Sequence, residues 1–276
     1  MDDRFSIARV GRDIVGMFRS QWAGVLLVVV VFGIGVGISQ QQAFTATTEA
    51  LSAIDLPGLQ PALSGLGQVA LNALFAGAML RAVLIGVEWH DRRGPLAPFR
   101  TMLVCFPAVF LAYLLIGLPR IVSTAVFSAL MASGSSEPST DLAVKASLVG
   151  IAVSVITLVI FTFLGAAPAA AVAEGLKPAA ALLRGAWLTR KRSLLLFALY
   201  LAVVMVAGIL GAGFVLFSVT NPQATVAGAS RRPLVMLALS LLLQTLQVVG
   251  AAAVYRELRR LNDPAAQIDE TVEVFS

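Results

Sequence analysis

Six long apolar runs divide the chain and decide what it can fold into. They occupy residues 22–38, 66–88, 101–120, 147–168, 194–217 and 234–255. A helix needs about 20 apolar residues to cross the hydrocarbon core of a bilayer, and each run is close to that length. Hydrophobic residues make up 58% of the chain and charged residues 13%, too few to cover the surface of a water-soluble domain. The sequence therefore predicts an all-α, polytopic membrane protein with six transmembrane helices.

Basic residues alternate from one loop to the next. Residues 1–21, 89–100, 174–193 and 256–276 hold four, three, five and three Lys or Arg residues, whereas the intervening loops hold three in total. Cytoplasmic loops of membrane proteins carry an excess of Lys and Arg, so this pattern predicts that both termini are cytoplasmic. Because the net charge of +5 comes from these loops, we expect an anionic phospholipid membrane as the partner, and no nucleic acid.

The stretch from Glu174 to Leu201 joins an amphipathic segment to an apolar run. Pro178 suits the first turn of a helix, because its φ is already helical and its missing N–H would have no partner there. At helical spacing, one side carries Ala179, Leu182, Leu183, Ala186 and Trp187, and the other carries Arg184 and Lys191. This pattern predicts a helix in the plane of the cytoplasmic membrane surface, with Trp187 at headgroup depth.

Residues 4–19 form a similar segment before the first span. Its apolar face carries Ile7, Val10, Ile14, Met17 and Phe18, opposite Arg9, Arg12 and Asp13. An in-plane helix is the prediction, and an ordinary basic flank is the alternative. We interpret residues 1–261 as one six-helix membrane domain and residues 262–276 as an acidic cytoplasmic tail.

Prolines and acids mark the ends of several spans. The third apolar run continues past Pro119, so we expect a tilted helix or a break there, and Pro168 should kink or end the fourth span. Glu88, Glu174 and Glu257 end the even-numbered spans at intervals of 86 and 83 residues. Three repeated hairpins would produce this spacing, but the ordinary charged inner ends of helices would also produce it.

A resemblance covers nearly the whole chain. Glu174-Gly175, Pro178, Ala181-Leu182, Arg184-Gly185, Trp187 and Leu188-Thr189, followed by a basic turn, resemble the signature of the glycerophosphoryl diester phosphodiesterase membrane domain family. Phe5-Ser6-Ile7 is similar to the start of that family, and Tyr255 with Leu258-Arg259 to its end. Gly185 stands where serine is common in the family, and we expect this to alter only a detail of the surface helix.

The resemblance implies a six-helix domain of the bacterial cytoplasmic (inner) membrane, sometimes fused to a separate catalytic domain. That catalytic domain needs a metal-binding barrel with several histidines and acids. This chain has one histidine, His90, so we expect no enzymatic activity, no cofactor and no metal.

Three sets of candidate residues follow. A lipid headgroup or ligand is expected at Arg81, Arg184, Arg190, Lys191 and Arg192, interfacial anchors at Trp22, Trp89, Trp187 and Arg120, and intramembrane polar contacts at Asn72, Gln244 and Gln247. Arg81 is costly at membrane depth, so it should reach the headgroups or meet Glu174.

These features favour a non-enzymatic scaffold or interaction module that engages anionic phospholipid together with a partner protein or a second copy of the chain. The alternative is a small transporter or lipid-handling protein with an arginine-lined site at Arg81.

Overall fold

The computed structural model describes residues 5–51, 59–85, 97–133, 140–205 and 232–262, and every regular element in these ranges is a helix. The labelled elements are α1 (Ile7–Leu51), α2 (Leu59–Leu84), α3 (Ala97–Ser133), α4 (Thr140–Leu164), α5 (Ala167–Glu174), α6 (Pro178–Thr189), the 3-10 turn η1 (Arg190–Arg192) and α9 (Arg232–Asn262). Residues 193–205 are also helical. The prediction of an all-α fold is confirmed for these residues.

Within the ranges that the structure describes, four segments are long and apolar enough to cross a membrane. They are Ile7–Gly33, Gly65–Leu84, Met102–Thr124 and Leu148–Glu174, and they overlap the first four predicted spans. The fifth predicted span, 194–217, passes out of the described ranges after residue 205, and the side chains of α9 are described from residue 241 onward. The chain is therefore a membrane-embedded helical protein, and the count of six spans stays a prediction.

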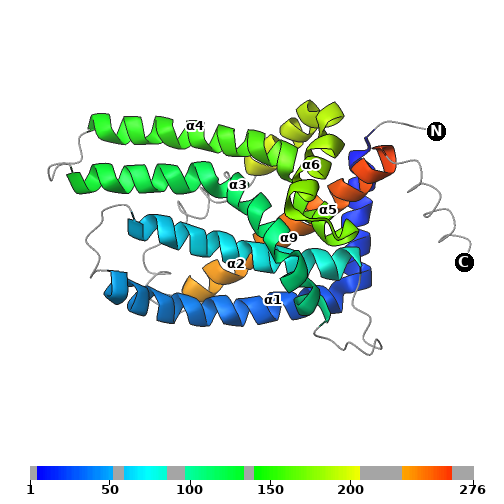
Figure 1. The fold of residues 1–276 in the computed structure, drawn as a ribbon, viewed down its shortest axis with the longest axis horizontal. Coiled ribbons are helices and arrows are strands. Elements are labelled where there is room, and N and C mark those ends of the chain that lie inside the picture. The colour runs from blue at the N-terminus through cyan, green and yellow to red at the C-terminus, as the bar shows by residue number, and fades with distance from the viewer. Residues whose placement is uncertain (1–4, 52–58, 86–96, 134–139, 206–231, 263–276) are drawn as a thin grey trace, which may run out of the picture.

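The long helices lie side by side, and the start of α1 meets the end of α9 (Figure 1). α2 packs against α3, α1 against α9, and α3 against α4. Several of these contacts use glycine. A Cβ on Gly33 would lie 3.1 Å from Leu241 on α9, and one on Gly117 would lie 3.2 Å from Val69 on α2. Small residues of this kind let helix backbones approach closely, which is how helices associate within a membrane.

α1 breaks near its beginning. Ser6 caps the helix through a hydrogen bond from the Arg9 N–H to its Oγ, and Gln21 leaves the helical region with φ −117° and ψ 20°. The part before this break runs across the ends of the long helices (Figure 1). The break thus lies at the predicted junction between the amphipathic segment and the span that begins at Trp22.

The proline predictions differ in outcome. α4 ends at Leu164, and α5 begins at Ala167 with Pro168 in its first turn, so Pro168 does end the fourth helix. α3 continues through Pro119 as one helix, and its axis bends along its length (Figure 1). α5 ends at Gly175, whose φ of 63° is a left-handed conformation that favours glycine.

Candidate functional site at the basic end

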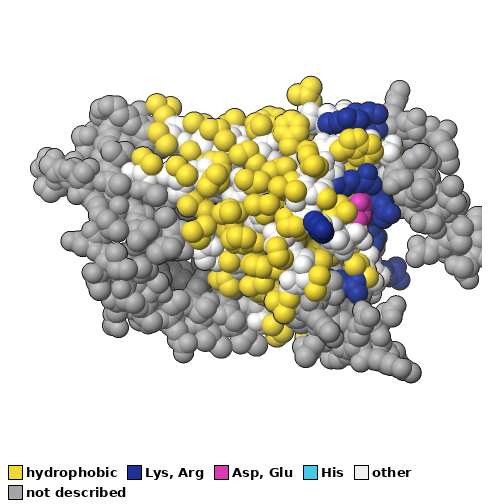
Figure 2. Space-filling view, viewed as in Figure 1, with side chains coloured by type: hydrophobic (Ala, Val, Ile, Leu, Met, Phe, Trp, Pro, Cys, Tyr) yellow, Lys and Arg dark blue, Asp and Glu magenta, His cyan; other side chains and the backbone are white. Residues whose placement is uncertain are grey.

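Lys and Arg side chains gather at the end of the molecule where α1 begins and α9 ends (Figure 2). We call this region the basic end; the elements that form it carry Arg9, Arg12, Arg19, Lys177, Arg184, Arg190, Lys191, Arg192, Arg256, Arg259 and Arg260. A broad apolar surface adjoins it (Figure 2), and exposed side chains of that kind include Val104 on α3 and Ile151 on α4. Such a surface suits lipid hydrocarbon, with the cations at headgroup level.

α6 has two apolar faces. The face that packs inward consists of Ala181, Gly185, Leu188 and Thr189. The other face is the one identified in the sequence, and part of it is exposed: Leu183 is 72% and Trp187 36% exposed, whereas Leu182 and Ala186 are half-buried. Leu194, just after the basic turn, is 85% exposed. The sequence pattern thus locates the face that the protein leaves uncovered, but it misses the face that fixes the helix to the bundle.

Gly185 is a packing position. A Cβ there would lie 2.8 Å from both the Cβ and the backbone N of Ala167 on α5. Because two of its three nearest atoms are backbone atoms that cannot move aside, a serine would force the two helices apart. The expectation that this glycine alters only a detail of the surface helix is wrong. The small-residue spacing of Ala181 and Gly185 is the signal that could have shown it.

Glu174 connects α5 to two other helices. Its carboxylate accepts hydrogen bonds from Arg184 Nε on α6, at 3.3 Å and 3.2 Å to its two oxygens, and from the Tyr255 hydroxyl on α9 at 2.7 Å. The ion-paired side chains of Arg184 and Glu174 are 25% and 18% exposed. Hydrogen bonds to a charged acceptor are among the stronger ones in proteins. The carboxylate therefore fixes the amphipathic helix α6 to the end of α9.

Glu257 makes a similar connection for the first amphipathic segment. The side chain of Glu257 is 1% exposed, and its carboxylate accepts a hydrogen bond from the Ser6 N–H at 3.1 Å. It also lies 3.5 Å from Arg9 Nε, and Arg260 Nε donates to it at 3.1 Å. Residues near the two ends of the described chain are thereby joined. The spacing of acids in the sequence identifies Glu257 as an acid at the cytoplasmic end of a predicted span, but it does not identify these partners.

Glu174 and Glu257 each bind an arginine of an amphipathic segment, Arg184 and Arg9 respectively. This shared arrangement fits the hypothesis of repeated hairpins. The third acid of that series, Glu88, lies outside the described residues, and so do Trp89 and His90.

Trp187 lies beside two guanidinium groups. The Arg184 Cζ atom is 5.0 Å from the centroid of the indole ring, and the Arg190 Cζ atom is 5.5 Å from it. Both distances fall within the range of cation–π attraction. Arg190 and Lys191 are exposed, and Arg192 is half-buried. Four of the predicted headgroup residues are thus brought together on α6 and η1.

Three side chains at the basic end donate hydrogen bonds to backbone carbonyls at the carboxyl ends of helices. Arg256 Nη2 donates to the carbonyls of Val83 and Leu84 in the last turn of α2, at 3.3 Å and 3.5 Å. Asn262 Nδ2 donates to Leu188 O on α6 at 3.4 Å, and Thr189 Oγ1 donates to Phe163 O on α4 at 3.2 Å. The last carbonyls of a helix lack partners within the helix, and a cation beside them is favourable. No local sequence pattern predicted these contacts.

Arg81 is half-buried in the last turn of α2, just before Val83 and Leu84, whose carbonyls accept hydrogen bonds from Arg256. The Nε atom of Arg81 is buried, and its reach to the headgroups stays a prediction. Glu174 binds Arg184 on α6 and Tyr255 on α9, and its expected contact with Arg81 also stays a prediction.

Two of the three predicted intramembrane amide side chains, those of Asn72 and Gln244, lie in contact in the structure. Asn72 Oδ1 accepts hydrogen bonds from Gln68 Nε2 and from Gln244 Nε2, both at 3.2 Å, so the expected contact between α2 and α9 is present. Gln247 is exposed, and within the described residues its amide has no hydrogen-bond partner. The expected helix-to-helix hydrogen bond is therefore present between Asn72 and Gln244, and for Gln247 it stays a prediction.

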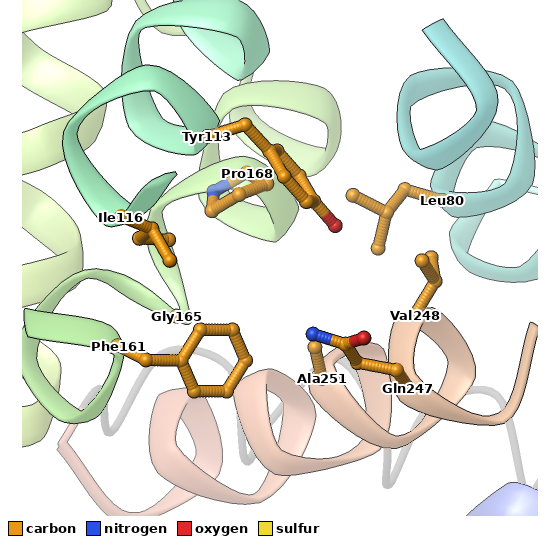
Figure 3. Close-up of a pocket in the computed structure, with 9 residues that line it drawn as sticks. All are labelled: Leu80, Tyr113, Ile116, Phe161, Gly165, Pro168, Gln247, Val248 and Ala251. Atoms are coloured by element: carbon orange, nitrogen blue, oxygen red, sulfur yellow. The ribbon is translucent and has the colours of Figure 1, made fainter. Parts of the chain in front are cut away.

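Gln247 and Tyr113 face a narrow crevice formed by α2, α3, α4, α5 and α9 (Figure 3). Its lining consists of Leu80, Tyr113, Ile116, Phe161, Gly165, Pro168, Gln247, Val248 and Ala251. The crevice is narrow and has room for about one water molecule. Arg81 is not among these lining residues.

Two of the predicted interfacial anchors lie on helices other than α6: Trp22 on α1 and Arg120 on α3. Trp22 is 64% exposed and follows the break at Gln21 directly, as an anchor at the start of a span should. Arg120 is exposed on α3, and its carbonyl accepts hydrogen bonds from Ser123 Oγ and Thr124 Oγ1.

No protein-family model, curated protein or solved structure matches the chain.

Proposed function

We propose that the protein is a non-enzymatic, multi-pass scaffold of the bacterial inner membrane whose basic end engages anionic phospholipid. A partner protein or a second copy of the chain would assemble on that end. The observation that carries the proposal is the pairing, on α6 and η1, of exposed apolar side chains with a cluster of cations. Leu183, Trp187 and Leu194 supply the apolar part, and Arg190 and Lys191 supply exposed positive charge.

The proposed topology has six spans, with both termini and the basic end in the cytoplasm. The alternation of Lys and Arg along the chain supports it. The break at Gln21 and the open apolar face of α6 support two helices in the membrane plane. The family resemblance at Glu174 to Leu201 supports the same architecture, and membership of that family is part of the proposal.

Electrostatic attraction supplies the selectivity. Each Lys or Arg close to an anionic membrane surface contributes about 1 kcal/mol of binding free energy, and the attraction falls off within the Debye length. Residues 174–193 contain five basic residues and one acid, Glu174. Anionic lipid should therefore collect around this segment in preference to zwitterionic lipid.

Lipid retention by the purified protein tests the proposal. The full chain is extracted in a neutral detergent with equal amounts of phosphatidylglycerol and phosphatidylcholine, and the retained lipids are counted by native mass spectrometry. We expect phosphatidylglycerol to be enriched, and the enrichment to fall in a variant in which Arg190, Lys191 and Arg192 are all changed to Ala. Arg120→Ala, which removes an exposed arginine from α3, is the control. Equal retention of the two lipids by the unchanged protein would overturn the proposal.

A further inference from the structure

Two neighbouring cations on α6 and η1 differ in how their charge is balanced. The guanidinium of Arg184 is ion-paired with Glu174. Within the described residues, Arg190 has no carboxylate within ion-pair distance, and its recorded contact is the Trp187 ring. In the part of the chain that the structure describes, the positive charge of Arg190 is therefore held against the Trp187 ring and is not paired with a carboxylate.

The position of Arg190 is fixed through a series of contacts. Tyr255 and Arg184 both bind Glu174, Arg184 lies 5.0 Å from the centroid of the Trp187 ring, and Arg190 lies 5.5 Å from the same ring. A guanidinium held on an aromatic ring loses less freedom when it binds a ligand. Its planar fork also matches two oxygens of a phosphate group.

Exposed leucines flank this cation on both sides. Leu183, Trp187, Arg190 and Leu194 follow one another at spacings of four, three and four residues. The backbone stays helical through Arg190 and Ser193, so these residues share one side of the turn. Leu183 and Leu194 are 72% and 85% exposed. A ligand that covers this strip must therefore carry both a negative charge and hydrocarbon.

We infer that this strip is a discrete site for one anionic phospholipid. Arg190 binds the phosphate oxygens, and an acyl chain lies along Leu194 and Leu183. The site deepens the proposed function and rests on it, because it locates one specific lipid within the general attraction of the basic end. A free phosphate would satisfy Arg190 but would leave both leucines uncovered.

Quenching of Trp187 fluorescence tests the site directly. Trp22→Phe and Trp89→Phe leave Trp187 as the single tryptophan of the full-length protein, because the chain has three. The protein is titrated in neutral detergent with phosphatidylglycerol or phosphatidylcholine that carries brominated acyl chains. We expect saturable quenching, with about tenfold tighter apparent binding of phosphatidylglycerol, the factor that one charge-assisted hydrogen bond supplies.

Two variants that each lose one positive charge distinguish a discrete lipid site from a general electrostatic attraction of the basic end. Arg190→Ala should remove most of the preference for phosphatidylglycerol, whereas Lys191→Ala, which removes the same charge from an exposed neighbour, should weaken the preference less. Arg190→Lys should give an intermediate preference, because it keeps the charge and loses the planar fork. Each variant is checked for folding by its thermal unfolding midpoint.

The possible contrary results have different meanings. Equal losses in Arg190→Ala and Lys191→Ala would overturn the discrete site and leave the proposed function standing. No lipid preference in the parent protein would overturn both. If inorganic phosphate or glycerol 1-phosphate displaced the brominated lipid completely at millimolar concentration, the ligand would be a soluble phosphate, and the assignment to a phospholipid would be wrong.

Discussion

The hydroxyl of Tyr255 donates a hydrogen bond of 2.7 Å to the carboxylate of Glu174, 81 residues earlier in the chain. The same carboxylate binds Arg184, so α9, α5 and α6 meet at one acid. α6 also packs against α5, α3 and α4 through its buried side. The polar connection at Glu174 adds a link from α6 to α9 and helps to fix the direction of its exposed face.

Tyr255→Phe should lower the free energy of unfolding by about 1–2 kcal/mol, because the substitution removes a hydrogen bond to a charged acceptor and little else. The midpoint of thermal unfolding in detergent measures the change. Tyr113→Phe is the matched control, since the Tyr113 hydroxyl has no hydrogen-bond partner within the described residues. Equal shifts in the two variants would show that the contact with Glu174 contributes nothing.

Glu257→Gln should loosen the first amphipathic segment. The substitution removes the charge that Arg9 and Arg260 bind, and we expect a cost of about 1–3 kcal/mol, because both arginines are partly exposed and regain some hydration. Hydrogen exchange of the backbone amides in residues 7–20 measures the loosening. Arg9→Ala should reproduce part of the effect.

Arg19→Ala is the control for Glu257→Gln, because Arg19 is an exposed cation of the same segment. Its exchange rates should match those of the unchanged protein. If Glu257→Gln left amide exchange in residues 7–20 unaltered, packing alone would hold the segment, and the ion pairs would have no structural role.

Asn72 and Gln244 should show a measurable coupling within the membrane. Asn72 Oδ1 accepts from both Gln244 and Gln68, so Asn72→Ala should cost more than Gln244→Ala. A double-mutant cycle on this pair should give a coupling of about 0.6 kcal/mol, the average for hydrogen bonds between transmembrane helices. Gln247→Ala, whose amide has no partner within the described residues, should be close to neutral. Additive effects of Asn72→Ala and Gln244→Ala would contradict the recorded contact.

Local sequence signals predicted local structure well. Pro168 and Pro178 each occupy the first turn of a helix, and the break at Gln21 precedes the predicted span by one residue. These features depend on backbone restrictions and on periodicity, which neighbouring residues determine. The exposed face of α6 was predicted for the same reason, since Leu183 and Trp187 lie on one side of an ideal helix.

Contacts between distant residues were not predictable in the same way. The bond from Tyr255 to Glu174 and the closure of α2 by Arg256 depend on which helices become neighbours. Periodicity gives the face of each helix but not its partner. Gly185 shows the difference: its spacing from Ala181 indicates a small-residue packing face, but nothing local identifies Ala167 as the residue that packs there.

Reporter fusions test the proposed orientation. Thr47 belongs to the far part of α1, and Ser193 follows the basic turn directly. A reporter that is active only outside the cytoplasm should be active after Thr47 and silent after Ser193. The opposite result at either position would reverse the assignment of the basic end to the cytoplasm.

Gly185→Ser and Gly250→Ala should change stability in opposite directions. A Cβ at Gly185 would lie 2.8 Å from Ala167, so the two helices must separate, and we expect a loss of about 1–3 kcal/mol in the free energy of unfolding. A Cβ at Gly250 on α9 meets nothing within 4 Å, so alanine should be neutral or should stabilise the helix by up to about 1 kcal/mol. Thermal unfolding in detergent measures both. Ala167→Gly should rescue Gly185→Ser only in part, because backbone atoms of residue 167 remain within 3 Å. Full rescue would mean that the two backbones are farther apart than described.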